Sequence, residues 1–289
     1  MNQRGGIAHF TTNGKKRVDT VAVRPIADDG PTTELLQLIH RSQMAKVHIL
    51  LKKEELDGQR LAGKVVVVLD VLFATSSIVT ALAHGASAVI PTLDGDSALL
   101  EAGTRPPGSY VLAGELNATT LAGFVHPTPL ALLGENLAGK TLIYLTTNGT
   151  VALNKSREAA HVYAAALLNG EAVVEHIERN FASETVLLVC SGSADNFNLE
   201  DFYGAGYLAS LFARRGGRAH EFSDAALAAQ LLHDQGDALD CLGRSRVGRM
   251  MLARGLEREV QFAAQKSCFD IVPRLQGGCL RISGTDGRV

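Results

Sequence analysis

The sequence predicts an α/β fold: a three-layer α/β/α arrangement with a mostly parallel sheet and a helical C-terminal segment. Three stretches rich in apolar residues, at 65–69, 142–145 and 185–190, are each followed by a turn of small polar residues and then by a helical pattern. This repeated order is typical of parallel strands joined by helices. Residues 224–264 show helical patterns almost throughout, which predicts the helical C-terminal segment.

The first predicted elements begin at residue 46. The stretch KVHILL at 46–51 has the composition of a strand. VVVVL at 65–69 contains no polar residue, which indicates a strand buried on both faces. A helical pattern, IVTALAHGA, follows it. Further along we expect strands at 87–91 and 110–113 and a helix at 94–103, which ends before the chain break RPPGS.

The second half continues the alternation. The stretch VYAAAL is a predicted strand, and a helix with glutamates on its solvent side follows it. A further helix is expected after the apolar stretch that ends at Cys190. The predicted elements of this half are strands at 142–145, 162–167 and 185–190, helices at 170–181 and 199–214, three helices between 224 and 264, and short strands at 269–275 and 279–283 that could complete the sheet.

The domain organisation follows from the same patterns. Residues 1–43 lack a sustained rhythm of strands and helices, so they are predicted to form a loosely ordered N-terminal extension. Residues 44–289 contain no low-complexity tract and no linker, so they are predicted to form a single α/β domain.

The composition excludes several classes of partner. The net charge is −2 and there is no basic stripe, which argues against binding of nucleic acid. No apolar run approaches the roughly 20 residues that span a bilayer, so no membrane association is expected. The four cysteines are scattered without metal-type spacing, which is typical of reduced thiols in a cytoplasmic protein. Self-association into a homo-oligomer is left open.

Asp70 is the first candidate site residue. It directly follows the apolar stretch 65–69, and Thr75 and Ser76 precede the next helical pattern. A carboxylate at the carboxyl end of a buried strand, facing hydroxyls and helix N–H groups, can hold a cation and a phosphate together. The alternative is structural: Asp70 ends the strand, and Thr75 or Ser76 caps the helix.

Other oxygen ligands occur where predicted strands end. Glu115 follows the strand at 110–113, and Thr147, Asn148 and Gly149 lie in the turn after the strand at 142–145. Such groups suit Mg²⁺, which is often held by one or two carboxylates together with a substrate phosphate. For Asn148 and Gly149 the alternative is a plain turn.

Two further carboxylates, Glu200 and Asp201, begin the predicted helix at 199–214. They are additional candidates for metal ligands. Acidic residues stabilise the first turn of any helix, however, and we favour that structural interpretation.

Several familiar motifs are absent from the sequence. There is no GxxxxGK[ST] phosphate loop, no GxGxxG dinucleotide fingerprint and no GxSxG nucleophile turn. Leu72, and not a second aspartate, lies two residues after Asp70. The nine histidines are scattered without metal spacing, so we expect surface or core positions for them.

The remaining motifs resemble those of the magnesium-dependent 2-phosphosulfolactate phosphatases, from about residue 44 to residue 282. The family pattern consists of DVLRATS after a strand, a GE pair, a TTNGT turn, a SLEDxxxAG segment and a final SxxGRxL…FDVVP stretch. Similar segments occur here in the same order: Asp70–Ser76, Gly114–Glu115, Thr146–Thr150, Leu199–Asp201 with Ala205–Gly206, and Ser245–Leu252 with Phe269–Pro273.

The resemblance implies a hydrolase, a Mg²⁺-dependent phosphatase that converts 2-phosphosulfolactate into sulfolactate and phosphate. In this hypothesis Asp70 and Glu115 are the catalytic residues and the metal ligands. The turns around Thr75–Ser76 and Thr147–Gly149 bind the phosphoryl group. The attacking group is either water or Asp70 itself.

The chain also departs from the family pattern. Phe73 and Leu116 stand where the pattern has arginines, residues suited to binding phosphate or sulfonate. Residues 123–129, GFVHPTP, are shorter than the family's GFDLGNSP, and Glu259 replaces a usual aspartate. We therefore expect a small anionic phosphoester that differs from the family's substrate, or poorer turnover of that substrate. The alternative is a degenerate member that binds a small anion or a partner protein without catalysis.

Overall fold

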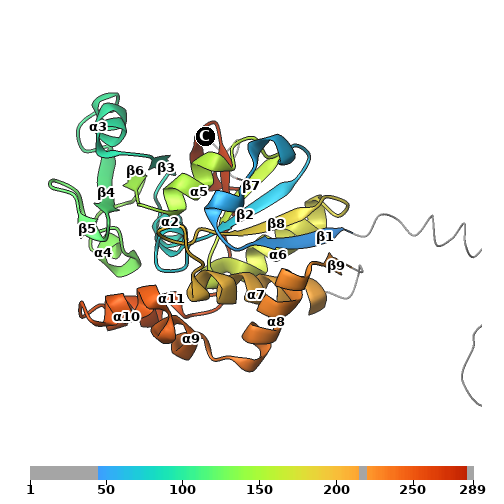
Figure 1. Ribbon diagram of the computed structural model, residues 1–289. Helices are drawn as coiled ribbons and strands as arrows, with labels where there is room; N and C mark the ends of the chain where they lie inside the picture. The colour runs from blue at the N-terminus through green and yellow to red at the C-terminus, as the bar shows by residue number, and fades with distance from the viewer. Residues whose placement is uncertain (1–44, 215–219, 285–289) are drawn as a thin grey trace, which may run out of the picture. The chain divides into compact units, whose positions relative to one another are not determined.

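A single mixed sheet forms the centre of the structure, with the strand order β5-β4-β6-β3-β11-β10-β7-β2-β8-β1-β9 (Figure 1). The computed structural model describes residues 45–214 and 220–284, so the predicted extension at 1–43 lies outside the described residues. Most neighbouring strands pair in parallel, and helices pack on both faces of the sheet. The predicted α/β class with three layers is thus confirmed.

Most predicted strands and helices occur with similar bounds. The short strands at 119–120 and 221–222 and the helix at 129–133 were not predicted, and the strand predicted at 269–275 begins only at Pro273. The strands are β1 (Lys46–Leu50), β2 (Val65–Leu69), β3 (Ala88–Thr92), β4 (Tyr110–Leu116), β5 (Thr119–Thr120), β6 (Thr141–Leu145), β7 (His161–Ala165), β8 (Val186–Cys190), β9 (Glu221–Phe222), β10 (Pro273–Gln276) and β11 (Cys279–Ile282). The helices of the α/β part are η1 (Lys53–Glu55), η2 (Gly58–Arg60), α2 (Ala74–Ala83), α3 (Gly95–Gly103), α4 (Pro129–Leu133), α5 (Gly149–Lys155), η3 (Leu167–Asn169), α6 (Gly170–Asn180) and α7 (Leu199–Arg214).

Strand β2 is buried on both faces, as its composition predicts. Val65, Val67 and Leu69 belong to one hydrophobic cluster, which also contains residues of α6 and α7. Val66 and Val68 point to the other face, into a cluster with residues of α2 and α5. Alternate side chains of one strand therefore enter two separate cores, because successive residues of a strand point to opposite faces. This fixes the carboxyl end of β2 firmly within the molecule.

The direction of the strands corrects one expectation. The site residues are predicted where strands of a mostly parallel sheet end, and the carboxyl ends of parallel strands would meet at one edge of the sheet. In the structure the hairpin β10–β11 lies between β7 and β3, and all three of its pairings are antiparallel. Strands β3, β4 and β6 therefore run opposite to β7, β2, β8 and β1. The hairpin strands come last in the chain, so their place within the sheet was not visible from the order of the elements.

The two halves of the sheet nevertheless share one core. Residues of β2 and of β6 meet in the same hydrophobic cluster, which contains residues of α2 and α5. Figure 1 shows α2 and α5 between the strands β3, β4 and β6 on one side and the strands around β2 on the other. The twist that accumulates over successive strands allows such a sheet to bend around the helices. The ends of β2 and β6 can thus meet although the strands run in opposite directions.

The C-terminal segment is helical, as predicted, but contains four helices instead of three. They are α8 (Asp224–Gln235), α9 (Ala238–Arg244), α10 (Arg246–Leu252) and α11 (Glu257–Ala263). Helix α9 was not predicted, because it is short and is separated from α10 only by Ser245. The Ser245 side chain accepts a hydrogen bond from the N–H of Gly248 and so caps α10. Among the described residues, no helix is long and apolar enough to cross a membrane.

Glu259 on α11 holds the short helix α4 in place. Its carboxylate accepts hydrogen bonds from the Thr128 hydroxyl at 2.6 Å and from the N–H groups of Leu130 and Ala131 at 2.9 and 3.2 Å. Glu259 is buried and therefore supplies the acceptors that the first turn of α4 needs. It has a structural role at this position, and it connects the C-terminal helices with the segment that precedes α4.

Replacement of Glu259 with alanine is expected to destabilise the protein by about 2 kcal/mol, because three donors would lose their acceptor. This corresponds to a decrease in Tm of about 4–8 °C for a protein of this size. Thermal unfolding measured by circular dichroism tests the prediction. The matched control is Glu257→Ala, since Glu257 is exposed on the same helix. Equal Tm values for the two variants would contradict the proposed role of Glu259.

Candidate active site

Asp70 lies directly after β2, in a turn that is stabilised by hydrogen bonds between Asp70 and the residues Ala74 and Thr75. Its Oδ1 accepts a hydrogen bond from the N–H of Ala74 at 3.2 Å. The hydroxyl of Thr75 donates to the carbonyl of Asp70 at 3.0 Å and accepts from its N–H at 2.9 Å. Asp70 is only 8% exposed. The carboxylate is thus fixed by the strand before it and by the helix after it.

The surroundings of Asp70 make its charge unfavourable. Burial raises the pKa of Asp70 from 3.8 to about 7, and the carboxylates of Glu200 and Glu115 add to this increase. The Ala74 N–H and the charge of Lys53 act in the opposite direction. A cation next to Asp70 would stabilise the ionised form, so the electrostatics of this position favour a positively charged ligand.

Gly149, the first residue of α5, packs directly against Asp70. A Cβ atom at Gly149 would lie 2.7 Å from Asp70 Oδ2 and 2.4 Å from the Cβ of Ala74. Both distances are shorter than van der Waals contact, so only glycine fits here. The start of α5 and the turn after β2 can meet this closely because position 149 has no side chain.

Glu115 on β4 holds the turn that precedes α5. Its carboxylate accepts hydrogen bonds from the N–H of Thr147 at 2.7 Å and from the Thr147 hydroxyl at 3.0 and 3.1 Å. It also accepts one from the N–H of Ala118 at 2.6 Å, and Ala118 has a left-handed backbone with a φ of 59°. The structure therefore brings Glu115 and the turn together, as predicted from the ends of β4 and β6.

Thr75 and Ser76 have a different placement from the one expected of phosphate ligands. Both are fully buried. The hydroxyl of Thr75 donates to the carbonyl of Asp70, and that of Ser76 donates to the carbonyl of Val71 at 2.8 Å. These hydroxyls shape the turn after β2. Direct contact of the two residues with a phosphate stays a prediction.

The two carboxylates at the start of α7 differ from each other. Asp201 accepts hydrogen bonds from the N–H of Val71 at 2.9 Å and from the N–H of Gly192 at 3.1 Å, so it connects the turn after β2 with the loop after β8. Burial raises the pKa of Asp201, and the charges of Asp70 and Glu200 contribute. Asp201 is therefore more than a residue that favours the helix dipole. It positions two loops beside Asp70.

Glu200 is 1% exposed, and burial raises its pKa as well. Its Oε2 atom has no hydrogen-bond partner among residues 45–214 and 220–284. Asp70, Glu200 and Asp201 thus form a group of buried carboxylates with raised pKa values. A buried oxygen of this kind needs a partner, either an ordered water or a cation.

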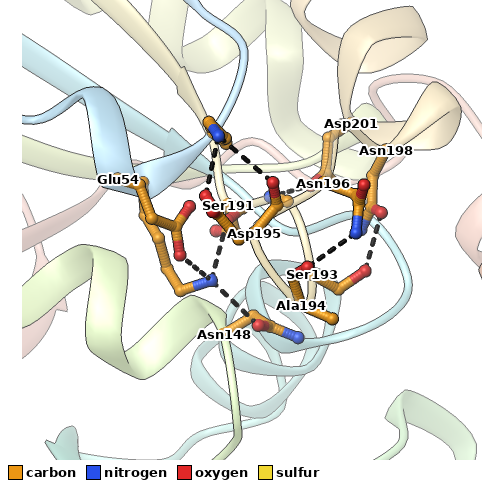
Figure 2. A network of polar contacts seen from close by, with 12 residues as sticks. Glu54, Asn148, Ser191, Ser193, Ala194, Asp195, Asn196, Asn198 and Asp201 are labelled. Carbon is orange, nitrogen blue, oxygen red and sulfur yellow. Dashed lines mark hydrogen bonds and ion pairs between the residues drawn. The ribbon is translucent and has the colours of Figure 1, made fainter.

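Lys53 supplies a positive charge that the sequence analysis did not identify. It lies in η1, directly after β1, and is only 6% exposed. Its Nζ donates to Asn148 Oδ1 at 3.0 Å and to the carbonyl of Ser191 at 3.3 Å, and it pairs with Glu54 at 3.0 Å. Figure 2 shows Asn148 facing Ser191 and Glu54 across these contacts. In the sequence, Lys53 belongs to a charged stretch, LKKEEL, that is typical of an exposed turn.

The loop after β8 is held by its own hydrogen bonds. The hydroxyl of Ser193 donates to Asn198 Oδ1 at 2.7 Å, and the backbones of Ser193 and Asn196 exchange two hydrogen bonds of 3.0 Å. Figure 2 shows these residues beside Asp201 at the start of α7. Lys52 anchors the outer side of the loop through Asp195 at 2.7 Å. The loop is therefore ordered next to Asn148.

A pocket of about 270 Å³ opens beside Asp70. Asp70, Glu115, Thr147 and Asn148 contribute polar groups to its lining, so four of the predicted site residues border one space. Gly149 packs behind Asp70. The structure thus brings together the groups at the ends of β2, β4 and β6, although these strands do not share a direction in the sheet.

Apolar side chains form another part of the pocket lining. Phe73 is one of them, so the residue that replaces a family arginine does border the site. Leu116, which replaces the other arginine, is 52% exposed and is not among the lining residues. The apolar lining residues include Leu72, Phe73, Val247, Met250, Met251 and Leu256.

The three basic residues of the lining, Arg246, Arg254 and His126, were not predicted from the sequence. Arg246 donates to the hydroxyl of Ser193, and Arg254 donates to the carbonyl of Ala118 at 2.5 Å. Both arginines belong to the C-terminal helical segment, whose place beside the pocket was not evident from the order of the elements. His126 also lines the pocket; it is exposed, as expected of a surface histidine, but its place among the site residues was not predicted.

Comparisons with known proteins identify the family of the chain. Residues 50–278 match the family described as 2-phosphosulpholactate phosphatase. A probable 2-phosphosulfolactate phosphatase of Clostridium beijerinckii is 32% identical to this chain. The similar region covers 81% of this chain and 98% of the length of the relative. A protein of the same description from Symbiobacterium thermophilum is 35% identical, over 75% of this chain and 93% of the length of that relative. Another from Thermotoga petrophila is 36% identical, over 73% of this chain and 89% of the length of that relative.

These matches identify an enzyme of the phosphoric monoester hydrolase class. The α/β fold, with buried carboxylates at the end of a central strand and a small pocket beside them, is consistent with this class. The chain belongs to the 2-phosphosulfolactate phosphatase family.

Proposed function

We propose that the chain is a Mg²⁺-dependent phosphatase that hydrolyses a small anionic phosphoester, of the type of 2-phosphosulfolactate, in the pocket beside Asp70. The observation that carries the proposal is the buried Asp70 carboxylate, which borders the pocket together with Glu115, Thr147 and Asn148. The family and the names of its relatives support the same reaction.

The residues present fit a magnesium ion. The described part of the chain contains no cluster of three or more histidine, cysteine, aspartate or glutamate side chains that could hold a metal. Mg²⁺ does not need such a cluster, because it often uses one or two carboxylates, water and substrate phosphate. Asp70 and Glu115 would hold the ion. When bound, it would neutralise the charge that develops on the phosphate oxygens.

The chain's own residues would bind and orient the phosphate. Lys53 is fixed by Asn148 and Ser191, so its charge lies next to the turn that begins α5. Arg246 borders the pocket from α10 and can meet an anionic group of the substrate. A preorganised arrangement of this kind lowers the barrier of phosphoryl transfer mainly by positioning and electrostatics.

The proposal is tested by measuring phosphate release from a panel of small phosphoesters, including 2-phosphosulfolactate, in the presence of Mg²⁺ or of a chelator. We expect turnover of at least one ester and a loss of turnover with the chelator. Binding of the esters without any release of phosphate would instead support the degenerate, non-catalytic alternative.

The stability of the protein is expected to depend jointly on pH and Mg²⁺. The pKa of Asp70 is about 7 in the folded protein, above its ordinary value of 3.8, so the folded state binds this proton more tightly. The stabilisation from that proton is present at low pH and is lost as the pH rises through 7. Glu200 and Asp201 act with the same sign. Mg²⁺ binds the ionised carboxylate, so the stabilisation of the folded protein by Mg²⁺ increases as the pH rises through 7.

We therefore expect Mg²⁺, at about 100 times its Kd, to raise Tm by about 5–10 °C near pH 8 and by much less near pH 5.5. Differential scanning calorimetry of the full chain, with Ca²⁺-free buffers and a chelator as the reference, tests this expectation. A Mg²⁺ effect of equal size at both pH values would show that no buried carboxylate with a raised pKa takes part in binding.

The substrate preference is expected to follow from Phe73. An aromatic ring in the pocket lining does not solvate a sulfonate, so 2-phosphosulfolactate should have a kcat/KM about tenfold lower than the same ester with a hydrocarbon group. Phe73→Arg should shift the preference towards the sulfonate. Leu116→Arg is the matched control, because Leu116 does not line the pocket. Efficient hydrolysis of 2-phosphosulfolactate by the unmodified protein would overturn this expectation.

A further inference from the structure

The segment His126–Thr128, before α4, is fixed at the pocket from two sides. The carbonyl of Pro127 accepts hydrogen bonds from the hydroxyl of Ser77 on α2 and from the hydroxyl of Tyr144 on β6, both at 2.6 Å. The hydroxyl of Thr128 donates to Glu259 on α11 at 2.6 Å. Two elements thus hold the backbone of the segment and a third holds the side chain of Thr128, and His126, Pro127 and Thr128 all line the pocket that contains Asp70.

The hydrogen bonds of Thr128 determine which ring nitrogen of His126 carries a proton. The Nδ1 of His126 lies 3.0 Å from the Thr128 hydroxyl oxygen. Thr128 has one hydroxyl proton, which it gives to Glu259, whose two oxygens also accept from the N–H groups of Leu130 and Ala131. Thr128 can therefore only accept from His126, so Nδ1 carries a proton. The other ring nitrogen, Nε2, is left to exchange protons at the pocket.

Hydrolysis of an alkyl phosphoester needs such a group. The bond between phosphorus and the ester oxygen breaks, and its electron pair stays on the leaving oxygen. An alkoxide is a poor leaving group unless it receives a proton as the bond breaks. Asp70 and Glu115 are carboxylates assigned to the cation, and Lys53 is held by Asn148, Ser191 and Glu54. His126 is the histidine that lines this pocket in the described part of the chain.

We propose that His126 is the general acid of the reaction, oriented by a Glu259–Thr128–His126 chain of hydrogen bonds. This inference depends on the proposed phosphatase function. In the step, the ester P–O bond breaks while a new P–O bond to water forms, and the proton on Nε2 moves to the leaving oxygen. The attacking water loses one proton to solvent, and solvent returns one to Nε2. The products are the alcohol and inorganic phosphate.

The test compares leaving groups that differ in their need for a proton. In His126→Gln, kcat for an alkyl phosphoester should fall by about 10²–10³-fold. With p-nitrophenyl phosphate, whose leaving group is stable as an anion, kcat should fall less than about threefold. His48→Gln serves as the matched control, because His48 lies on β1 and does not line the pocket. Across a series of aryl phosphates, log kcat should depend more steeply on the pKa of the leaving group in His126→Gln than in the native protein.

Thr128 is a positioning residue in this scheme, and its variants separate orientation from simple stability. Thr128→Val removes the hydroxyl and should lower kcat for the alkyl ester by about tenfold, with little effect on p-nitrophenyl phosphate. Thr128→Ser keeps the hydroxyl and should restore most of the activity. The double variant His126→Gln/Thr128→Val should be no slower than His126→Gln, because both substitutions remove the same function.

Two results would overturn the inference. A loss of equal size with alkyl and aryl esters would show that His126 acts on binding or structure alone, and unchanged turnover of the alkyl ester would show that it takes no part. Either result leaves the phosphatase function intact. Absence of phosphate release by the native protein from every ester would instead refute the proposed function, and the inference with it.

Discussion

Replacing Asp70 with asparagine is expected to lower kcat by about 10³-fold while the fold is kept. Asparagine has the same shape, and its Oδ1 can still accept the hydrogen bond that Ala74 donates at 3.2 Å. Asparagine also caps a helix as well as aspartate does, so loss of a cap cannot explain a large effect. What disappears is the negative charge at the end of β2. Phosphate release from the best ester of the panel, at saturating Mg²⁺, measures the effect.

Thermal unfolding of the same variant gives a second, independent readout. Because burial raises the pKa of Asp70 to about 7, its ionised form is unfavourable near pH 8 without a cation. The asparagine side chain carries no charge, so Asp70→Asn should have a Tm equal to or above that of the native protein in the presence of a chelator. Addition of Mg²⁺ should no longer raise its Tm.

Asp96→Asn is the matched control, since Asp96 is exposed on α3 and does not line the pocket. It should change neither kcat nor the response to Mg²⁺. If Asp70→Asn had near-normal activity and an unchanged response to Mg²⁺, Asp70 would be a structural residue of the turn, and the proposed site would lose its centre.

Asp70 could be found from the sequence because the signal is local. A run of five buried apolar residues predicts both the strand and the place where it ends, and a polar residue at that place stands out. The turn before α5 could be found in the same way. Glu115 could be found as well, although β4 extends through Glu115 to Leu116 and is longer than predicted.

Lys53, His126 and Arg246 could not be found by the same reasoning. Each belongs to a stretch that has the composition of an exposed turn or helix start, and each is placed only by packing between distant parts of the chain. His126 and Arg246 line the pocket, and Lys53 contacts Asn148, which lines it. Lys53, for instance, contacts Asn148 and Ser191, which follow it by 95 and 138 residues. A local pattern contains no information about such contacts.

The order of the strands was hidden for a related reason. The last two strands of the chain enter the middle of the sheet, where β10 pairs with β7 and β11 with β3. Their sequence predicts short strands but not their neighbours. The consequence for the site is large, since β2 and β6 end in opposite directions along the sheet. Their polar ends still meet, because the sheet bends around α2 and α5.

The turn after β2 and the start of α5 meet at Gly149. The substitution Gly149→Ala is expected to lower kcat by about 10²-fold and Tm by about 3–10 °C. The new Cβ would lie 2.4 Å from the Cβ of Ala74 and 2.7 and 3.0 Å from two atoms of Asp70. The carboxylate is held by the N–H of Ala74, so it cannot turn away without losing that hydrogen bond. The start of α5 must therefore move away from the turn after β2.

This displacement should affect catalysis more than stability, because it moves Asn148 and Thr147 relative to Asp70. A second substitution can separate the two effects: Ala74→Gly removes the shorter of the clashes but leaves both contacts with Asp70. The double variant should regain most of the lost Tm and little of the lost kcat. Gly103→Ala at the end of α3, where a Cβ meets no atom within 4 Å, is the control for the substitution itself. If Gly149→Ala kept normal kcat, the contact between α5 and Asp70 would not determine the geometry of the catalytic groups.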